Sequence, residues 1–175
     1  MKVSSLKIPD VKLIEPQVID DDRGYFFESF NQNEFNKTIG SNINFVQDNQ
    51  SKSSKGVLRG LHLQREPFSQ GKLVRVVSGE IFDVVVEVRK DSKTFSNWLG
   101  IYLNDIDQKQ LWVPNGFAHG FMAMSNETTI LYKVTNYYSK EHEVTIFYDD
   151  DDLSIEWPSN IPKKISEKDK NGISL

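Results

Sequence analysis

The stretch that decides the fold begins Gly56-Val57-Leu58-Arg59-Gly60-Leu61-His62-Leu63-Gln64 and resumes as Gln70-Gly71-Lys72-Leu73-Val74-Arg75-Val76-Val77. Apolar residues dominate both segments, so most of each segment is expected to be buried β-strand. The segments also carry polar and charged side chains, and burying such groups without partners is costly. These side chains either point to solvent or line a polar cavity, and we favour a cavity with His62 as its base. They are Arg59, His62, Gln64, Lys72 and Arg75.

Gly60 decides which of these side chains can share a face. In a regular strand successive side chains alternate, which places Arg59 and His62 on opposite faces. A glycine inside a strand often marks a β-bulge, where the alternation is broken. A bulge at Gly60 would bring Arg59 and His62 to the same face.

Length and composition limit the class of protein. A chain of 175 residues without an internal repeat is expected to form a single domain, residues 1–175, with a sizeable core. A net charge of −4 gives no electrostatic footprint for nucleic acid or for an acidic membrane. The absence of cysteine excludes disulfides and thiolate chemistry. We find no apolar signal region and no membrane-spanning run, so a soluble cytoplasmic protein is expected.

Most of the chain reads as short strands separated by turn signals, at a spacing typical of a β-sandwich or β-barrel. Hairpins are expected at Ser78-Gly79 and at residues 125–127. Pro16 is expected to restrict its strand to a sheet edge or an interface. The expected strands cover residues 11–19, 25–30, 72–77, 80–89, 98–103, 110–113, 121–124, 128–135 and 143–148.

Two short helices interrupt this all-β pattern. Asn31 is a candidate N-cap for a helix over residues 32–39, which Gly40 would close. Residues 166–169 begin a short helical turn near the C-terminus. The sequence therefore predicts an all-β domain with a few short helices.

Several stretches together resemble the dTDP-4-dehydrorhamnose 3,5-epimerase family, a branch of the cupin-like jelly rolls. They occur in the family's order and spacing over nearly the whole chain. The matching stretches are DRGYFFE at 22–28, FVQDN at 45–49, GVLRGLH at 56–62, QGKLV at 70–74, PNGFAHGF at 114–121, YK at 132–133, YY at 137–138 and SEKD at 166–169. The resemblance implies a cupin-like jelly-roll β-barrel or sandwich.

The resemblance also implies an isomerase that inverts C3 and C5 of a nucleotide-linked 4-keto-6-deoxysugar, with no metal and no organic cofactor. A proton α to a ketone can be removed by a side-chain base if the enolate is stabilised. By resemblance His62 is that base, Asp169 orients it, and Lys72 stabilises the enolate. Tyr132 resembles the general acid that returns a proton to the opposite face.

The remaining matched positions concern the nucleotide sugar. Arg59 and Arg23 resemble diphosphate ligands, Tyr138 resembles the wall on which the base stacks, and His119 resembles a histidine that contacts the sugar. In this family the site is shared across a homodimer, and three residues reach it from the other subunit: Arg23, Phe26 and Glu28. The other matched ligand positions are Gln47, Asn49, Glu143 and Lys168.

Each assignment has a structural alternative. A lone histidine in a β-rich domain is usually a hydrogen-bonded structural residue, and His119 could only brace a turn. Ser166 with an acidic residue three positions later resembles a capping box, so Asp169 could serve a helix cap alone. Tyr132 could be a strand filler, and Lys72 could be solvated. His142, between two glutamates, is expected at the surface.

Other functions stay open at this stage. Metal-binding cupins usually carry a His-x-His pair, which is missing because Leu63 and Gln64 follow His62, although two histidines and a carboxylate could still bind a metal. A 3-only or 5-only epimerase, and a non-catalytic sugar-nucleotide-binding jelly roll, are further alternatives. Gln50 stands where many family members carry His, and Glu87 where Asp is usual. The nucleotide and sugar therefore stay undecided, including a GDP-linked 4-keto-6-deoxyheptose.

Overall fold

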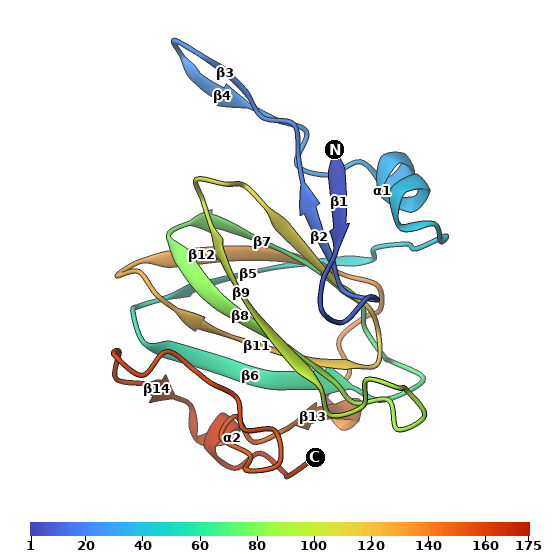
Figure 1. Cartoon of the computed structure of the whole chain (residues 1–175), viewed down its shortest axis with the longest axis vertical. Helices are drawn as coiled ribbons and strands as arrows, with labels where there is room; N and C mark the ends of the chain where they lie inside the picture. Colours follow the sequence, from blue (N-terminus) through green and yellow to red (C-terminus); the bar gives the residue numbers. More distant parts are fainter.

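The computed structural model describes residues 1–175 and consists mainly of two antiparallel β-sheets packed face to face (Figure 1). The first sheet has the strand order β1 (Lys2–Ser5), β2 (Lys12–Glu15), β10 (Gln110–Val113), β7 (Lys72–Ser78), β12 (Thr128–Val134) and β5 (Gln47–Ser53). The second has the order β13 (Glu143–Thr145), β6 (Val57–Gln64), β11 (Phe117–Ala123), β8 (Glu80–Glu87) and β9 (Trp98–Asn104). The short β14 (Lys164–Ile165) adds to β6 in parallel.

The main core lies between the sheets, where apolar side chains from both meet. Val74, Val76 and Ile130 come from the first sheet, and Val85 and Phe121 come from the second. Two further clusters cover the outer faces. One includes Phe35 of α1 (Gln32–Ile39) with Leu73 and Trp112, and the other joins the second sheet to a C-terminal segment through Leu153, Ile155, Trp157 and Ile161.

Because apolar clusters pack on both faces of the second sheet, its central strands β8 and β11 are apolar along nearly their whole length. Residues 81–87 of β8 and all residues of β11 are buried, because these strands have protein on both faces. Such strands read as continuous apolar runs rather than as alternating ones. A polar residue in them, such as Asp83 or His119, must therefore find a partner inside the protein.

The two predicted hairpins are wrong, because each joins strands of different sheets. β7 pairs with β10 and β12, whereas β8 pairs with β9 and β11. Gly79 turns the chain across the sandwich with φ 84°, and its N–H donates to Asp105 Oδ2 at 2.9 Å. The turn between β11 and β12 also crosses. A glycine turn signal shows that the chain reverses, but burial of both strands' inner faces decides which strands pair.

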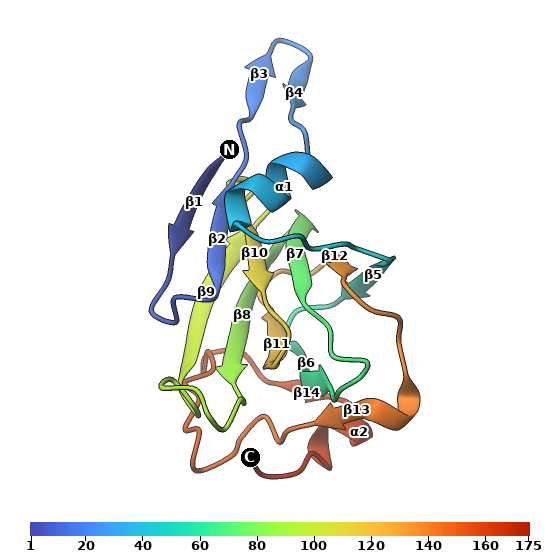
Figure 2. The same ribbon diagram turned by 90° about the vertical axis from the view of Figure 1, so that its right-hand side faces the viewer.

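The N-terminal strands are shorter than predicted. β2 ends at Glu15, directly before Pro16, and is flanked by β1 and β10, so the expected edge strand is an interior strand that the proline ends. In place of a strand over residues 25–30, β3 (Ile19–Asp21) and β4 (Gly24–Phe26) form a hairpin that projects from the body of the molecule (Figures 1 and 2). The last predicted strand, 143–148, shortens to β13.

The predicted helices are confirmed. The Asn31 side chain accepts from the N–H groups of Asn33 and Glu34, and Gly40 closes α1 with φ 76°. α2 (Glu167–Lys170) begins after Ser166, and a 3₁₀ turn, η1 (Lys140–His142), precedes β13. None of the helices is long and apolar enough to cross a membrane.

Candidate active site

A cavity of about 540 Å³ opens between the two sheets, close to α2. Its walls come from both sheets and from the segment that leads into α2. Polar and charged side chains interrupt the apolar lining, as expected for a site that fixes a polar ligand. Its charged and titratable lining residues are Arg59, His62, Lys72, His119, Tyr132, Lys164, Lys168 and Asp169.

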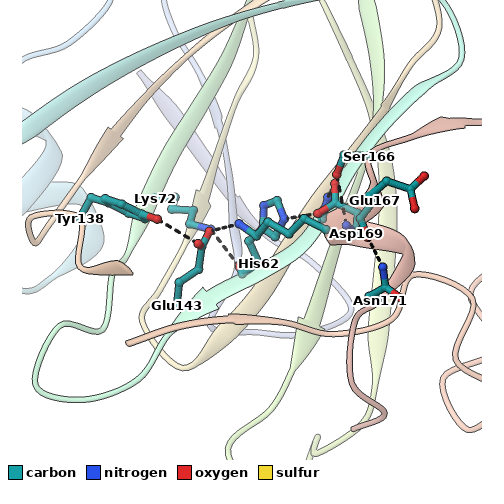
Figure 3. Close-up of polar contacts among 10 residues, drawn as sticks. His62, Lys72, Tyr138, Glu143, Ser166, Glu167, Asp169 and Asn171 are labelled. Carbon is teal, nitrogen blue, oxygen red and sulfur yellow. Dashed lines mark hydrogen bonds and ion pairs between the residues drawn. The ribbon is translucent and has the colours of Figure 1, made fainter. Parts of the chain in front are cut away.

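His62 of β6 and Asp169 of α2 form a close pair. Nε2 of His62 lies 2.7 Å from Oδ1 of Asp169, and Oδ2 accepts from the N–H of Gly60 at 3.3 Å (Figure 3). Burial disfavours the charged carboxylate, but the hydrogen bond and charge of His62 outweigh it and hold the pKa of Asp169 below its usual range. The Asp169 side chain is 4% exposed, so the carboxylate is committed to this contact.

The helix cap and the His62 contact use different atoms. Ser166 Oγ caps α2 by accepting from the backbone N–H of Asp169 at 3.1 Å (Figure 3). The Asp169 carboxylate does not return to Ser166 as in a capping box, and points to His62 and Gly60 instead. The same short helix is thus capped by Ser166 and delivers a buried carboxylate to the cavity.

The bulge at Gly60 is confirmed. β6 pairs His62 with His119 and Arg59 with Phe121, so two residues of β6 lie opposite one residue of β11. As a result Arg59 and His62 both line the cavity. Gly60 has φ 120°, and a Cβ on it would lie 2.6 Å from Gly120 Cα, so only glycine fits without displacement.

Lys72 enters the cavity from β7 on the opposing sheet and is 8% exposed. Its Nζ donates to the backbone carbonyl of His62 at 3.0 Å. Burial lowers the pKa of Lys72 to about 8, and the negative charges of Asp83 and Glu143 limit that fall. A substantial cationic fraction is therefore retained at neutral pH in a position where water is largely excluded.

Tyr132 lies on β12 of the first sheet, so it lines the wall of the cavity opposite to β6. No protein group hydrogen-bonds its hydroxyl. Burial raises the pKa of Tyr132, and the positive charge of Arg59 opposes that rise. The phenol is therefore protonated at neutral pH and can donate to a ligand.

His119 of β11 has a carboxylate of its own, which sequence reasoning missed. Its Nε2 lies 2.9 Å from both carboxylate oxygens of Asp83, and Asp83 is fully buried. A lone acidic residue within the apolar run of β8 was the available signal, because a buried charge needs a partner. His62 and His119 are cross-strand neighbours, so two histidine–aspartate pairs share one wall.

A second hollow, of about 290 Å³, shares His62, Lys72 and Tyr132 with the cavity. Gln47 donates to Asn49 at 2.8 Å, and Tyr138 donates to Glu143 at 3.0 Å. Burial disfavours the Glu143 carboxylate, but hydrogen bonds from Lys168 and Tyr138 outweigh it and lower the pKa of Glu143. These four predicted nucleotide residues therefore border the larger cavity as one connected set.

Three predicted residues do not reach this cavity within one chain. Arg23 and Phe26 lie on the β3–β4 hairpin and Glu28 follows it, away from α2 (Figure 1). Phe26 is 71% exposed, and Arg23 pairs with Asp21 inside the hairpin. Phe26 and Glu28 border a separate hollow of about 370 Å³ near α1.

His142, the third histidine, lies outside the cavity. His142 is partly buried rather than at the surface, because its ring packs on Phe68 and Nδ1 lies 2.8 Å from Ser139 Oγ. No group of three or more His, Asp or Glu side chains is arranged to hold a metal ion.

Proteins similar to this chain in sequence and in structure are sugar-nucleotide epimerases. A curated relative from Shigella flexneri, a dTDP-4-dehydrorhamnose 3,5-epimerase, is 53% identical over 172 residues, covering 98% of this chain and 94% of that protein. The crystal structure of dTDP-6-deoxy-D-glucose-3,5-epimerase from Legionella pneumophila, in complex with dTDP-4-keto-L-rhamnose, superposes with a TM-score of 0.96 at 43% identity, covering 99% of this chain and 92% of that one.

A more distant structure has the same fold. It is a 3'-monoepimerase from Streptomyces bikiniensis in complex with dTDP-quinovose, with a TM-score of 0.92 at 29% identity, covering 97% of this chain and 86% of that one. The family model described as dTDP-4-dehydrorhamnose 3,5-epimerase matches residues 5–175. The chain, a cupin-like jelly roll, therefore belongs to the dTDP-4-dehydrorhamnose 3,5-epimerase family.

Proposed function

We propose that this chain inverts C3 and C5 of a dTDP-linked 4-keto-6-deoxyhexose by removing each α-proton and returning a proton to the opposite face. The observation that carries this proposal is that His62 and Tyr132 line one cavity from opposing sheets. Inversion requires a base on one face of the sugar and an acid on the other. The choice of dTDP follows the family to which the chain belongs.

His62 acts as the base. A neutral imidazole nitrogen can accept a carbon-bound proton, and histidine is the side chain that most often serves as a general base. Asp169, held by Gly60 N–H and by its own position on α2, orients the ring and favours the imidazolium that forms. The proton moves from C3 or C5 to the histidine, and the electron pair passes to the ketone oxygen O4.

Lys72 stabilises the enolate. The developing negative charge on O4 needs a cation in a site that excludes water, where the interaction is stronger than in solution. Lys72 is buried, cationic in its protonated form and fixed by the His62 carbonyl. His119, which Asp83 holds from behind, lines the same cavity and can contact the sugar.

Tyr132 completes the inversion by donating its phenolic proton to the face opposite His62. Its hydroxyl has no protein partner, and its raised pKa keeps it protonated. After each inversion solvent removes the proton from the His62 imidazolium and reprotonates the tyrosinate, so both groups are ready for the second carbon. The same pair can then act at the second α-carbon once that carbon lies between His62 and Tyr132.

The nucleotide is bound beside the reacting sugar. We assign the diphosphate to Arg59, and the ribose and base to the connected residues of the second hollow. Tyr138, 55% exposed at its rim, offers an aromatic face for the base. The other members of that set are Gln47, Asn49 and Glu143. Lys168 lines the larger cavity and is joined to the set by donating to Glu143.

A homodimer would complete this site. The hairpin carrying Arg23 and Phe26 exposes apolar surface in one chain, with Ile19 57% and Tyr25 58% exposed. Exposed apolar strands of this kind favour association with a second subunit. In that dimer Arg23, Phe26 and Glu28 of each subunit reach the cavity of the other.

The test is to incubate the protein with dTDP-4-keto-6-deoxyglucose in deuterated water and to locate the incorporated label by NMR. The expected result is deuterium at both C3 and C5, with the inverted product. Label at one position only would indicate a 3-only or 5-only epimerase, for which the monoepimerase of similar fold is a precedent. Binding without exchange would favour the non-catalytic jelly roll.

A further inference from the structure

The inner face of β5 is polar along its whole length, which is unusual for a strand of a sandwich. Its burial alternates, so that the residues at 47, 49, 51 and 53 face inward while those between them are exposed. In place of apolar core residues these positions hold Gln47, Asn49, Ser51 and Ser53. The first two belong to the proposed nucleotide site, but the two serines have no role in it so far.

Ser51 carries an unsatisfied polar atom. Its Oγ is buried, and it is the one buried side-chain nitrogen or oxygen in the chain without a hydrogen-bond partner. Leaving such a group unpaired is unfavourable, so an unpaired buried hydroxyl in a native protein needs an explanation. Ser51 is also a lining residue of the 540 Å³ cavity, so a ligand in that cavity can supply the missing partner.

Ser53 is one step further along the same face and holds Arg59. Nε of Arg59 donates to Ser53 Oγ at 3.1 Å, and Nη2 donates to the Lys52 carbonyl at 3.4 Å. Ser53 is 5% exposed, and Arg59 forms no ion pair with a carboxylate. The guanidinium is thus oriented by β5 while its charge stays available to an anion.

We propose that Ser51 and Ser53 form, with Arg59, one anion subsite for the diphosphate of the substrate. Ser53 is a positioning residue that orients the Arg59 guanidinium toward the cavity. Ser51 is a direct ligand that donates its hydroxyl to a diphosphate oxygen. This inference rests on the proposed function, because it assigns to the diphosphate a place within the proposed site.

The sequence of β5 accounts for the choice of serine at both positions. The register places Ser51 opposite Ile130 and Ser53 opposite Thr128 on β12. A small side chain at 51 leaves room for a ligand between β5 and the cavity, and a hydroxyl adds a donor without adding charge. An apolar residue at 51 would continue the core toward Ile130 and narrow the cavity.

The experiment measures binding of dTDP, thymidine and inorganic pyrophosphate by calorimetry, together with the thermal midpoint of the unliganded protein. The variants are Ser51→Ala, Ser53→Ala, Arg59→Ala and the double variant Ser53→Ala/Arg59→Ala. Ser4→Ala, on the opposite edge strand β1 of the same sheet, is the matched control.

Ser51→Ala is expected to weaken dTDP and pyrophosphate binding ~10-fold, the effect of one lost hydrogen bond to a charged group, and to leave thymidine binding unchanged. Its thermal midpoint without ligand should not fall, because no hydrogen bond is lost in the free protein. A lower midpoint with unchanged dTDP affinity would mean that Ser51 is only structural, and would overturn its role.

Ser53→Ala should also weaken dTDP binding, but it should add nothing in the Arg59→Ala background, since it acts through the guanidinium. Additive losses would overturn the positioning role. If wild-type protein binds dTDP with this serine dependence but exchanges no sugar proton, the subsite stands and the proposed epimerase fails. If wild type catalyses epimerisation and the serine variants bind dTDP normally, the subsite fails alone.

Discussion

Asp169 and His62 are 107 positions apart in the chain, yet Oδ1 of Asp169 lies 2.7 Å from Nε2 of His62. The contact depends on the last helix of the fold, which Ser166 caps through the Asp169 backbone N–H. The carboxylate is therefore positioned by a cap that it does not itself form. This separation makes the roles of the two residues distinguishable by mutation.

Asp169→Asn is expected to lower kcat at least ~10-fold, because the amide cannot stabilise the imidazolium that forms when His62 accepts a proton. Ser166→Ala should instead lower the free energy of unfolding by ~1 kcal/mol through loss of the N-cap, with a much smaller effect on kcat. Steady-state kinetics and urea unfolding of both variants provide the check. Equal losses of kcat and stability in the two variants would mean that Asp169 acts only through the helix.

Activity should depend on the charge of Lys72. Its pKa of about 8 means that the cation is lost as pH rises through that value. If the cation stabilises the enolate, kcat/KM, which reports the pKa values of the free enzyme, should fall on the alkaline side of pH 8. A pH profile of kcat/KM measures this directly. A flat profile from pH 7 to about 10 would show that charged Lys72 is not needed for the chemical step.

The lowered pKa of Lys72 also makes the free energy of unfolding depend on pH. The pKa of Lys72 is about 8 in the folded protein and 10.5 in its ordinary state, so the unfolded chain binds more protons between these values. Below pH 8 the free energy of unfolding is therefore lowered by the full cost of burying the cation. It recovers that amount as pH rises toward 10.5. Lys72→Met should be more stable than wild type at pH 7, and urea unfolding should show the difference shrinking above pH 8. A constant difference would contradict the shifted pKa.

Gly60→Ala should be more harmful than its backbone angle alone predicts. Gly60 and Gly24 have nearly the same φ, 120° and 124°, but a Cβ on Gly24 meets nothing within 4 Å, whereas one on Gly60 meets Gly120 Cα at 2.6 Å. Gly24→Ala therefore serves as the control for backbone strain. We expect Gly60→Ala to lower the free energy of unfolding by ~1–3 kcal/mol more than the control. Equal losses in urea unfolding would show that the bulge can widen freely.

The sequence predicted local features better than strand pairing. Strand character, the bulge at Gly60, the helix cap at Asn31 and the partner of His62 followed from residue type, spacing and resemblance. The pairing of β7 with β12 rather than with β8 did not, because a turn such as Gly79 specifies only a reversal and the pairing depends on which faces are buried. Asp83 was missed because its partner His119 comes from a neighbouring strand, a contact that no local pattern contains.

The proposed shared site can be tested by complementation. In a heterodimer of one Arg23→Ala chain and one His62→Ala chain, one of the two sites has both residues intact, and the other has neither. Two inactive homodimers should therefore regain activity after mixing and exchange of subunits. Mixing two His62→Ala preparations is the control. If heterodimers form, as shown by mass spectrometry of tagged chains, and activity does not return, Arg23 does not act in the partner's site.

Tyr132→Phe should separate the two proton transfers that inversion requires. The variant keeps the ring and its packing but removes the phenol, so His62 can still form the enolate with Lys72 beside it. The enolate then regains a proton most easily from His62, on the face it left. In deuterated water the variant should exchange α-protons faster than it forms inverted product.

His62→Asn is the matched variant for that experiment, and it should lose exchange and inversion together, by at least ~10²-fold. NMR of the sugar in deuterated water follows both quantities in one sample. Binding of dTDP, measured in parallel, shows that each variant retains the nucleotide site. If Tyr132→Phe and His62→Asn lose exchange and inversion in the same proportion, Tyr132 is not a separate acid. It would then be a residue that binds the enolate, and the proton on the far face would come from another donor, such as water.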